Sequence, residues 1–286
     1  TFGNAAPMAV EQIPANGSIR LSSFNLTLSA NYFTQLTERL SGNLKIEITA
    51  EAEPIFCQTY PIDILTYDQS GGLNVFPEML AAFITPNHTA ISPIIKRAAS
   101  ILGQWTGNPS LDEYQSRTPD RVRKQMAAIY TAIAEQQIIY STVPASFEEY
   151  GQRVRLADSV MAQKLGTCLD MALLYASCLE AIGLNALIVI TQGHAFAGAW
   201  LVPETFPDPT IDDVSLLTKR TAEGIYDITL VETTCMNMGH SSDFDDAVKK
   251  ANGKLADGNN FLLAIDIKRA RYSGVRPIPQ RILHGQ

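Results

Sequence analysis

The spacing of hydrophobic and polar residues changes near residue 70 of the chain. Before this point, Leu44–Thr49 alternates strictly between apolar and polar side chains, which predicts a half-buried β-strand. Two further segments, Ile19–Leu28 and Ile55–Leu65, carry apolar and β-branched residues between turn signals. We therefore expect residues 1–68 to form a small antiparallel β-sandwich, which the linker Gln69–Gly72 joins to the rest of the chain.

Beyond the linker the apolar period lengthens to about 3.6 residues, which is typical of amphipathic helices. Apolar stripes with this spacing predict helices near 76–83 and 91–101. Thr118-Pro119 predicts the start of a longer helix, because Thr can cap free amides and Pro fits the first turn. From there to Ile267 the pattern predicts the order helix, loop, helix, strand, strand, helix, strand, helix, strand. Residues 73–286 are thus expected to form an α+β domain with a mainly antiparallel sheet.

Composition and charge restrict the partners that this chain can have. Hydrophobic residues make up 46% and charged residues 18%, a balance that predicts a folded chain. The net charge of −7 argues against direct binding of nucleic acid, which needs clustered Lys and Arg. No apolar run approaches the ~20 residues of a membrane-spanning helix, and the start lacks a signal-peptide pattern. We therefore expect a cytoplasmic protein that binds neither a membrane nor nucleic acid directly.

The four cysteines are too widely spaced to predict a disulfide framework or a zinc ribbon. Cys178 lies on an apolar stretch and is expected in the core. Cys235 could join Cys168 and His194 around zinc, but no close pair of ligands would anchor the metal. The sequence therefore predicts no metal and no cofactor.

The segment around Cys168 has the pattern of a helix start. Gly166 and Thr167 predict a turn and an N-cap, and the apolar run Met171–Ala181 predicts a buried helix. Cys168 would then lie on the first turn, where free amides and the helix dipole stabilise a thiolate and can also face an oxyanion. The alternative is a structural role, since a free Cys packs like a small hydrophobe.

Two later strands are expected to bring a base and an acid to the same place. Leu184–Ile190 predicts a buried strand that ends near His194, and Ala195–Val202 predicts the next strand. Tyr226–Glu232 predicts a third strand, which ends at its acidic residue. Glu232 could accept the second ring N–H of His194 and hold its tautomer, which completes the three roles of a catalytic triad.

Several neighbouring residues are expected to be structural. Asp170 is interpreted as a helix cap or ion-pair partner, Trp200 as a core residue and His240 as a surface residue. The acidic segment Pro203–Asp213 is expected to be a solvated excursion, although its position after the His194 strand would let it border a substrate cleft.

These residues carry a resemblance to a known superfamily. The order Gly-x-Cys-x-Asp on a helix, Gly-His on one strand and an acidic residue before Thr on the next resembles the transglutaminase-like superfamily, relatives of papain-type cysteine proteases. The resemblance covers roughly Phe147–Glu232. The sequences Leu-Gly-Thr-Cys-Leu-Asp and Gly-His-Ala-Phe-Ala-Gly-Ala-Trp are similar to those of domains in large bacterial proteins that carry a helicase-like ATPase further along the chain. In those proteins a β-rich segment also precedes the thiol domain.

Carried over to this chain, the resemblance implies Cys168 as nucleophile, His194 as general base and acid, and Glu232 as the orienting carboxylate. The superfamily most often has Asp at the third position, which leaves open whether Glu232 or another residue orients His194. Gln152 is the candidate for a side-chain oxyanion donor. It is preferred to Gln163, which is expected to lie in a helix of its own.

The resemblance thus implies a thiol protease that cleaves an amide of a protein or peptide through a thioester. Three alternatives remain: acyl transfer to an amine, a non-catalytic binding module with the β-domain as docking surface, and a regulatory protease domain within a defence ATPase assembly. Because the chain starts at Thr1 without a Met, we expect it to be a piece of a longer polypeptide, with a downstream ATPase or helicase-like region as a partner.

Overall fold

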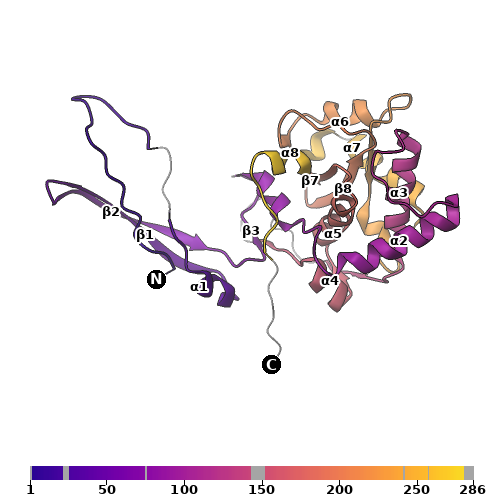
Figure 1. Cartoon of the computed structure of the whole chain (residues 1–286), viewed down its shortest axis with the longest axis horizontal. Coiled ribbons are helices and arrows are strands. Elements are labelled where there is room, and N and C mark those ends of the chain that lie inside the picture. Colours follow the sequence, from indigo (N-terminus) through magenta and orange to yellow (C-terminus); the bar gives the residue numbers. More distant parts are fainter. Residues whose placement is uncertain are drawn as a thin grey trace. The chain divides into compact units, whose positions relative to one another are not determined.

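The computed structural model describes residues 2–21, 26–74, 76–142, 152–240, 242–256 and 258–279. The chain divides into two compact units, of which the first runs to Tyr67 and the second begins at Asp68 (Figure 1). Helices and antiparallel sheets occur together, so the fold class is α+β. Within the described residues, none of the helices has the length and apolar character needed to cross a membrane.

The first unit consists mainly of a long β-hairpin. β1 (Leu40–Ala50) and β2 (Glu53–Ile64) pair antiparallel along their whole length, and the short helix α1 (Ala30–Gln35) precedes them. The alternation that predicted the first strand places its apolar residues on one face, opposite Tyr60 and Phe56 of the second. These side chains remain between 36% and 50% exposed: Leu44, Ile46, Ile48, Phe56 and Tyr60. Both predicted strands of this hairpin are confirmed.

The expected β-sandwich is not formed by the described residues of the first unit. A sandwich needs two packed sheets, but here the hairpin is the only sheet in the described part of this unit. Of the predicted strand Ile19–Leu28, residues 22–25 lie outside the described residues, and the described remainder forms no strand beyond one bridge between Leu28 and Gly3. The prediction was wrong because a local apolar pattern indicates extended backbone but does not specify a pairing strand.

The second unit is built around a five-stranded antiparallel sheet with the strand order β10-β8-β7-β11-β9. Two of the interior strands, β7 and β8, are buried along almost their whole length, which explains their continuous apolar sequence. The predicted antiparallel sheet is confirmed, and its main helices and strands follow one another in the predicted order, with a short helix and several two-residue strands in addition. The strands span Ala186–Thr191 (β7), His194–Trp200 (β8), Thr210–Ile211 (β9), Ile228–Val231 (β10) and Phe261–Asp266 (β11).

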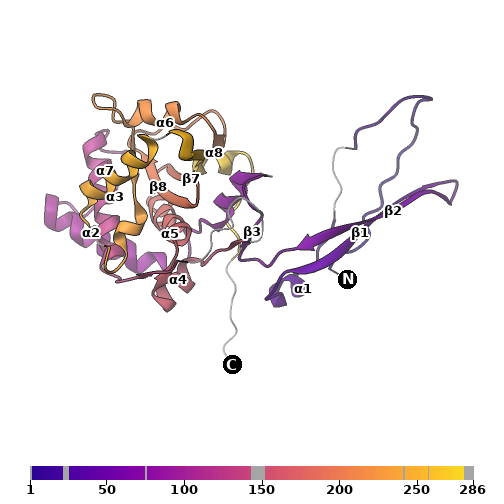
Figure 2. The ribbon, with the colours of Figure 1, turned by 180° about the vertical axis from the view of Figure 1, so that it is seen from behind.

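Helices cover both faces of this sheet (Figures 1 and 2). On one face, Leu187, Phe196 and Leu230 form a core with Leu217 of α6 (Val214–Thr221) and with α7 (Phe244–Ala256). On the other, α5 (Cys168–Ala181) packs against β7 and β8. Alternate residues of β8 point to opposite faces of the sheet, and those that alternate with Phe196 and Trp200 are alanines. The face toward α5 is therefore lined by small side chains, so the helix can approach closely. Gly198 allows the same close approach to β10, because a Cβ there would lie 2.4 Å from the Thr229 carbonyl oxygen.

The remaining helices complete the second unit. Pro119 begins α3 (Pro119–Ala134) as predicted, but the Thr118 side chain makes no capping hydrogen bond. The predicted helix near 76–83 is a 3₁₀-helix, η1 (Pro77–Phe83), preceded by Phe76 in the left-handed region. The other helices are α2 (Ile91–Thr106), α4 (Ala157–Gln163), η2 (Thr233–Met236), η3 (Gly258–Asn260) and α8 (Ile267–Tyr272).

Two segments expected to be loops take part in pairing. Gln69–Ser70, expected as linker, forms β3 and pairs antiparallel with β5 (Gln152–Arg153). The excursion Pro203–Asp213 buries Phe206 and adds β9 to the sheet edge. Its Phe206 amide and the Trp200 indole both donate to the buried carboxylate of Asp266, at 2.9 and 3.0 Å, and Trp200 is a core residue as predicted. A further short pair, β4 (Ile139–Tyr140) with β6 (Leu165–Gly166), is parallel.

Candidate active site

Cys168 is the first residue of α5, as its flanking sequence predicted. A reciprocal capping box defines this helix start: the Asp170 amide donates to the Thr167 hydroxyl at 3.2 Å, and the Thr167 amide donates to the Asp170 carboxylate at 2.9 Å. The Cys168 side chain is only 6% exposed. The thiol therefore lies beside the positive end of a helix dipole, in a setting largely withdrawn from bulk water.

Asp170 has the structural role that the sequence favoured. It is fully buried and accepts hydrogen bonds from the Arg155 amide at 2.8 Å and the Arg155 guanidinium at 3.2 Å, besides the capping bond. The segment that follows β5 is thereby bound to the amino end of α5. Asp170 thus orders both the backbone before Cys168 and a neighbouring segment.

His194 is held at the end of the sheet by a tight turn. It is the first residue of β8, pairs with Thr191 of β7, and follows Gly193, whose φ of 65° is in the left-handed region that favours glycine. Its Nε2 lies 2.8 Å from Oε2 of Glu232. A hydrogen bond to Cys168 is among the causes that raise the pKa of His194, and Nδ1 is the ring nitrogen that the contact with Glu232 leaves available for the thiol.

Glu232 is positioned by the helix that follows it. It comes directly after β10 and caps η2, where its Oε1 accepts from the Thr234 hydroxyl at 2.7 Å and from the Thr234 amide at 3.2 Å. Its Oε2 is left for His194, with Lys254 Nζ 3.6 Å away. The extra methylene relative to Asp is accommodated because the side chain folds back over η2. Glu232 itself is thus the residue that contacts His194.

The electrostatics of the site favour a protonated imidazole. Burial lowers the pKa of His194, but hydrogen bonds to Cys168 and Glu232 and the charges of both partners outweigh it and raise the pKa to about 9. Burial raises the pKa of Glu232, yet its bonds to His194 and Thr234 hold that pKa below its ordinary value. The acid is thus ionised and the imidazole charged near neutral pH.

Gln152 lies on β5, three residues before Arg155, which is bound to Asp170 at the amino end of α5. Its side chain is 8% exposed, and its amide oxygen has no hydrogen-bond partner in the described part of the chain. An oxyanion donor would act through the amide nitrogen, so the unpaired oxygen does not bear on this role. The role predicted for Gln152 stays a prediction. Gln163 ends α4, the separate helix expected for it.

The sequence missed one residue that faces the thiol. Tyr140 was not singled out from the sequence, but after burial the nearby Cys168, through its charge and a hydrogen bond, raises the pKa of the Tyr140 hydroxyl. Nothing in the local pattern predicts this proximity, since the parallel pairing of β4 with β6 creates it by placing Tyr140 opposite Gly166, far along the chain. Thr234, which orients the acid, follows Glu232 by two residues and could have been suggested by its spacing alone.

The other cysteines and histidines lie outside the triad geometry. All four cysteines are free, with Cys178 completely buried in α5. Cys235 is buried beside Lys250, whose Nζ lies 3.5 Å from its sulfur. Among the described residues, no group of three or more His, Cys, Asp or Glu side chains could hold a metal ion. His240 is exposed, as expected.

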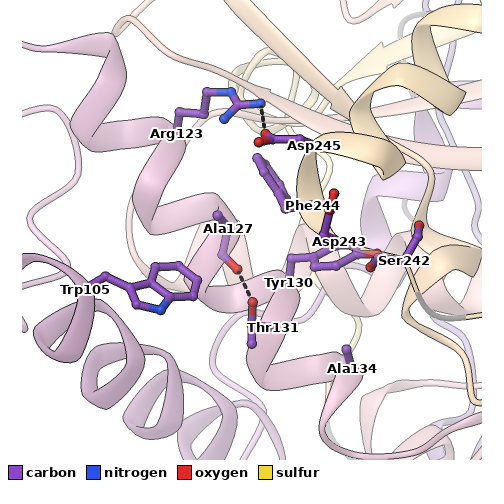
Figure 3. Close-up of a pocket in the computed structure, with 10 residues that line it drawn as sticks. All are labelled: Trp105, Arg123, Ala127, Tyr130, Thr131, Ala134, Ser242, Asp243, Phe244 and Asp245. Atoms are coloured by element: carbon purple, nitrogen blue, oxygen red, sulfur yellow. Dashed lines mark hydrogen bonds and ion pairs between the residues drawn. The ribbon is translucent and has the colours of Figure 1, made fainter.

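A separate groove of about 500 Å³ lies along α3 (Figure 3). Ala127 and Thr131 of α3 line it between Trp105 on one side and Phe244 on the other. The Arg123–Asp245 ion pair, 2.6 Å long, closes one end. No residue of the triad lines this groove, so it is not the cleft of the thiol site.

No family model, curated protein or solved structure matches this chain. Its function is therefore argued from the chemistry that the site residues can perform.

Proposed function

We propose that this protein is a cysteine-dependent amide hydrolase that cleaves a protein or peptide through a thioester. One observation carries the proposal: a thiol at the amino end of a buried helix faces an imidazole whose second nitrogen lies 2.8 Å from a buried carboxylate. Nucleophile, base and orienting acid are the three roles of a cysteine protease triad. The resemblance of the same three residues to the transglutaminase-like superfamily supports the proposal.

The proposed reaction has two halves. The Cys168 thiolate attacks the carbonyl carbon, and the tetrahedral oxyanion is stabilised by free amides at the start of α5 and by a side-chain donor, for which Gln152 is the candidate. The imidazolium of His194 gives its proton to the departing amine as the C–N bond breaks. In the second half, neutral His194 takes a proton from water, whose oxygen attacks the thioester and releases the acid and the thiolate. Glu232 keeps the ring oriented and favours its charged form throughout.

Water is the proposed acyl acceptor. The resemblance is to bacterial members of the superfamily, in which hydrolysis is the expected outcome. Acyl transfer to an amine shares every step but the last, so it is the first alternative. A non-catalytic binding module is the second, and the mutual contacts of Cys168, His194 and Glu232 count against it because a binding role requires none of them.

The proposed hydrolase can be tested by the fate of the acyl group. The protein is incubated with a mixed peptide library and a fluorescent primary amine, and products are identified by mass spectrometry. New peptide termini that are absent with Cys168→Ala are expected. Amine incorporated into glutamine side chains would instead establish acyl transfer, and the absence of both products would contradict an enzyme of this type on these substrates.

The activity should fall on the alkaline side of the pH profile with a midpoint of about 9, where His194 loses its proton. Glu232→Gln should move this midpoint to lower pH, because the carboxylate raises the pKa of His194. In the unaltered protein, the raised pKa of His194 also contributes to the free energy of unfolding. This contribution is complete below the ordinary pKa of 6.5 and is lost as the pH rises through about 9. The measurement is kcat/KM against pH for both proteins. An alkaline midpoint that Glu232→Gln leaves unmoved would contradict the assigned pair.

The wider setting is proposed from the resemblance alone. A downstream ATPase or helicase-like region of the same polypeptide would be the partner, the location would be cytoplasmic, and the cleavage would serve defence. The experiment for this setting is to isolate the native polypeptide and determine whether it continues into such a region.

A further inference from the structure

Tyr140 lies on a short strand, β4, that contacts both the segment before Cys168 and the segment after Glu232. On one side, β4 pairs in parallel with β6, with Tyr140 opposite Gly166, two residues before Cys168. The Ser141 amide reinforces this pairing with a 2.9 Å bond to the Gly166 carbonyl. The segment that leads into Cys168 therefore determines where Tyr140 lies.

The other side of β4 is hydrogen-bonded to the segment that follows Glu232. Ile139 bridges to Met238, and the Met238 amide donates to the Ile138 carbonyl at 2.8 Å. The Asn237 side chain donates to the same carbonyl at 3.1 Å. Asn237 directly follows η2, the helix that Glu232 caps. Tyr140 is thus held between the chain that carries the nucleophile and the chain that carries the acid.

The side chain of Tyr140 is oriented by the strand and by one ring contact. Ile138 is fully buried and Ile139 is 53% exposed, so the alternation of the strand turns Tyr140 inward again. Its ring meets that of His240 edge to face, with centroids 6.3 Å apart and an interplanar angle of 76°. In this position the hydroxyl lies near enough to Cys168 for the charge and hydrogen bonding of the thiol to raise the pKa of Tyr140.

We propose that Tyr140 donates its phenolic hydrogen to the Cys168 thiolate, as a second donor beside His194. This inference rests on the proposed function and adds a residue to its reacting centre. A thiolate carries no proton and gains from each donor aimed at it, and a hydrogen bond to a charged acceptor is stronger than one between neutral groups. Tyr140 would therefore help to keep the nucleophile ionised before substrate arrives.

Tyr140 remains a proton donor over the working pH range. Burial, followed by the neighbouring charge of Cys168, raises the pKa of Tyr140 to about 12. Of the other charged groups near the thiol, His194 faces it from β8, and Glu232 lies behind His194 with Lys254 beside it. Asp170, on the same helix, is bound to Thr167 and Arg155.

The test measures the thiolate itself and needs no substrate. The absorbance at 240 nm is followed against pH below 9 for the full chain and for its Cys168→Ala form, and the difference reports ionisation of Cys168. With Tyr140→Phe the midpoint of this difference should rise by about 1 pH unit, because a bond to the charged form is lost while the ring is kept. Tyr130→Phe, which removes a hydroxyl that donates to the Ser242 carbonyl, is the matched control and should leave the midpoint unchanged.

An unchanged midpoint in folded Tyr140→Phe would overturn the proposal, and so would an equal rise in Tyr130→Phe. Tyr140→Leu separates packing from hydrogen bonding: a shift in Leu without a shift in Phe would assign the effect to the ring and contradict the donor role. The outcome is independent of turnover. A protein that cleaves no peptide but shows the expected shift would retain the Tyr140 inference and lose the hydrolase.

Discussion

Cys168→Ala should reduce the rate of amide hydrolysis by about 10⁴-fold or more, to the level set by substrate binding and the oxyanion donors alone. Alanine removes the sulfur that forms the thioester, and no other described thiol lies beside His194. The helix start should persist, because its capping bonds run through Thr167 and Asp170. The measurement is kcat/KM on a peptide that the intact protein cleaves, together with the circular dichroism spectrum.

Cys57→Ser is the matched control for this change. Cys57 is a free, exposed cysteine on β2, outside the candidate site, so its loss should leave kcat/KM unchanged. Activity that survives Cys168→Ala at more than a few per cent would mean that another group is the nucleophile. A covalent acyl adduct found on a peptide other than that containing Cys168 would identify it.

Asp170→Ala should lower the free energy of unfolding of the second unit by about 3–5 kcal/mol, the range for breaking a buried ion pair from one side. Asp170 is completely buried and accepts from two amides and from the Arg155 guanidinium. Removal of the carboxylate leaves the amides of Thr167 and Arg155 without an acceptor. Activity should fall as well, because these bonds order the backbone next to Cys168. Urea unfolding followed by fluorescence measures the stability change.

Asp213→Ala is the comparison for the loss of a helix cap by itself. Asp213 caps α6 through a 2.8 Å bond from the Ser215 amide, but it is exposed, so water can replace the carboxylate. Its loss should cost clearly less than that of Asp170. Equal effects from the two substitutions would show that Asp170 acts as a helix cap only and that its contact with Arg155 contributes little.

The α+β class, the order of elements and the start of α5 could all be predicted, because each rests on local information. An apolar run, a capping residue and a turn glycine act within a few positions of one another, so their effect is present in the sequence itself. The prediction of a β-sandwich was wrong because it too rested on local information. The pattern of the first unit correctly indicated the two strands of the hairpin but did not specify which strands pair. The exposed apolar face of the hairpin shows the limit of periodicity as a guide to burial.

The sequence by itself determined which residues have the chemistry for this site: a thiol at a helix start, a histidine at the beginning of a strand and an acid at the end of another. The tertiary structure decided that these groups meet, that Thr234 directs one oxygen of Glu232 toward His194, and that Tyr140 faces the same sulfur. Apart from the local contact of Thr234 with Glu232, these contacts join residues far apart in the chain. They depend on strand pairing and packing, whose energies come from the whole fold and leave no signal in any short segment.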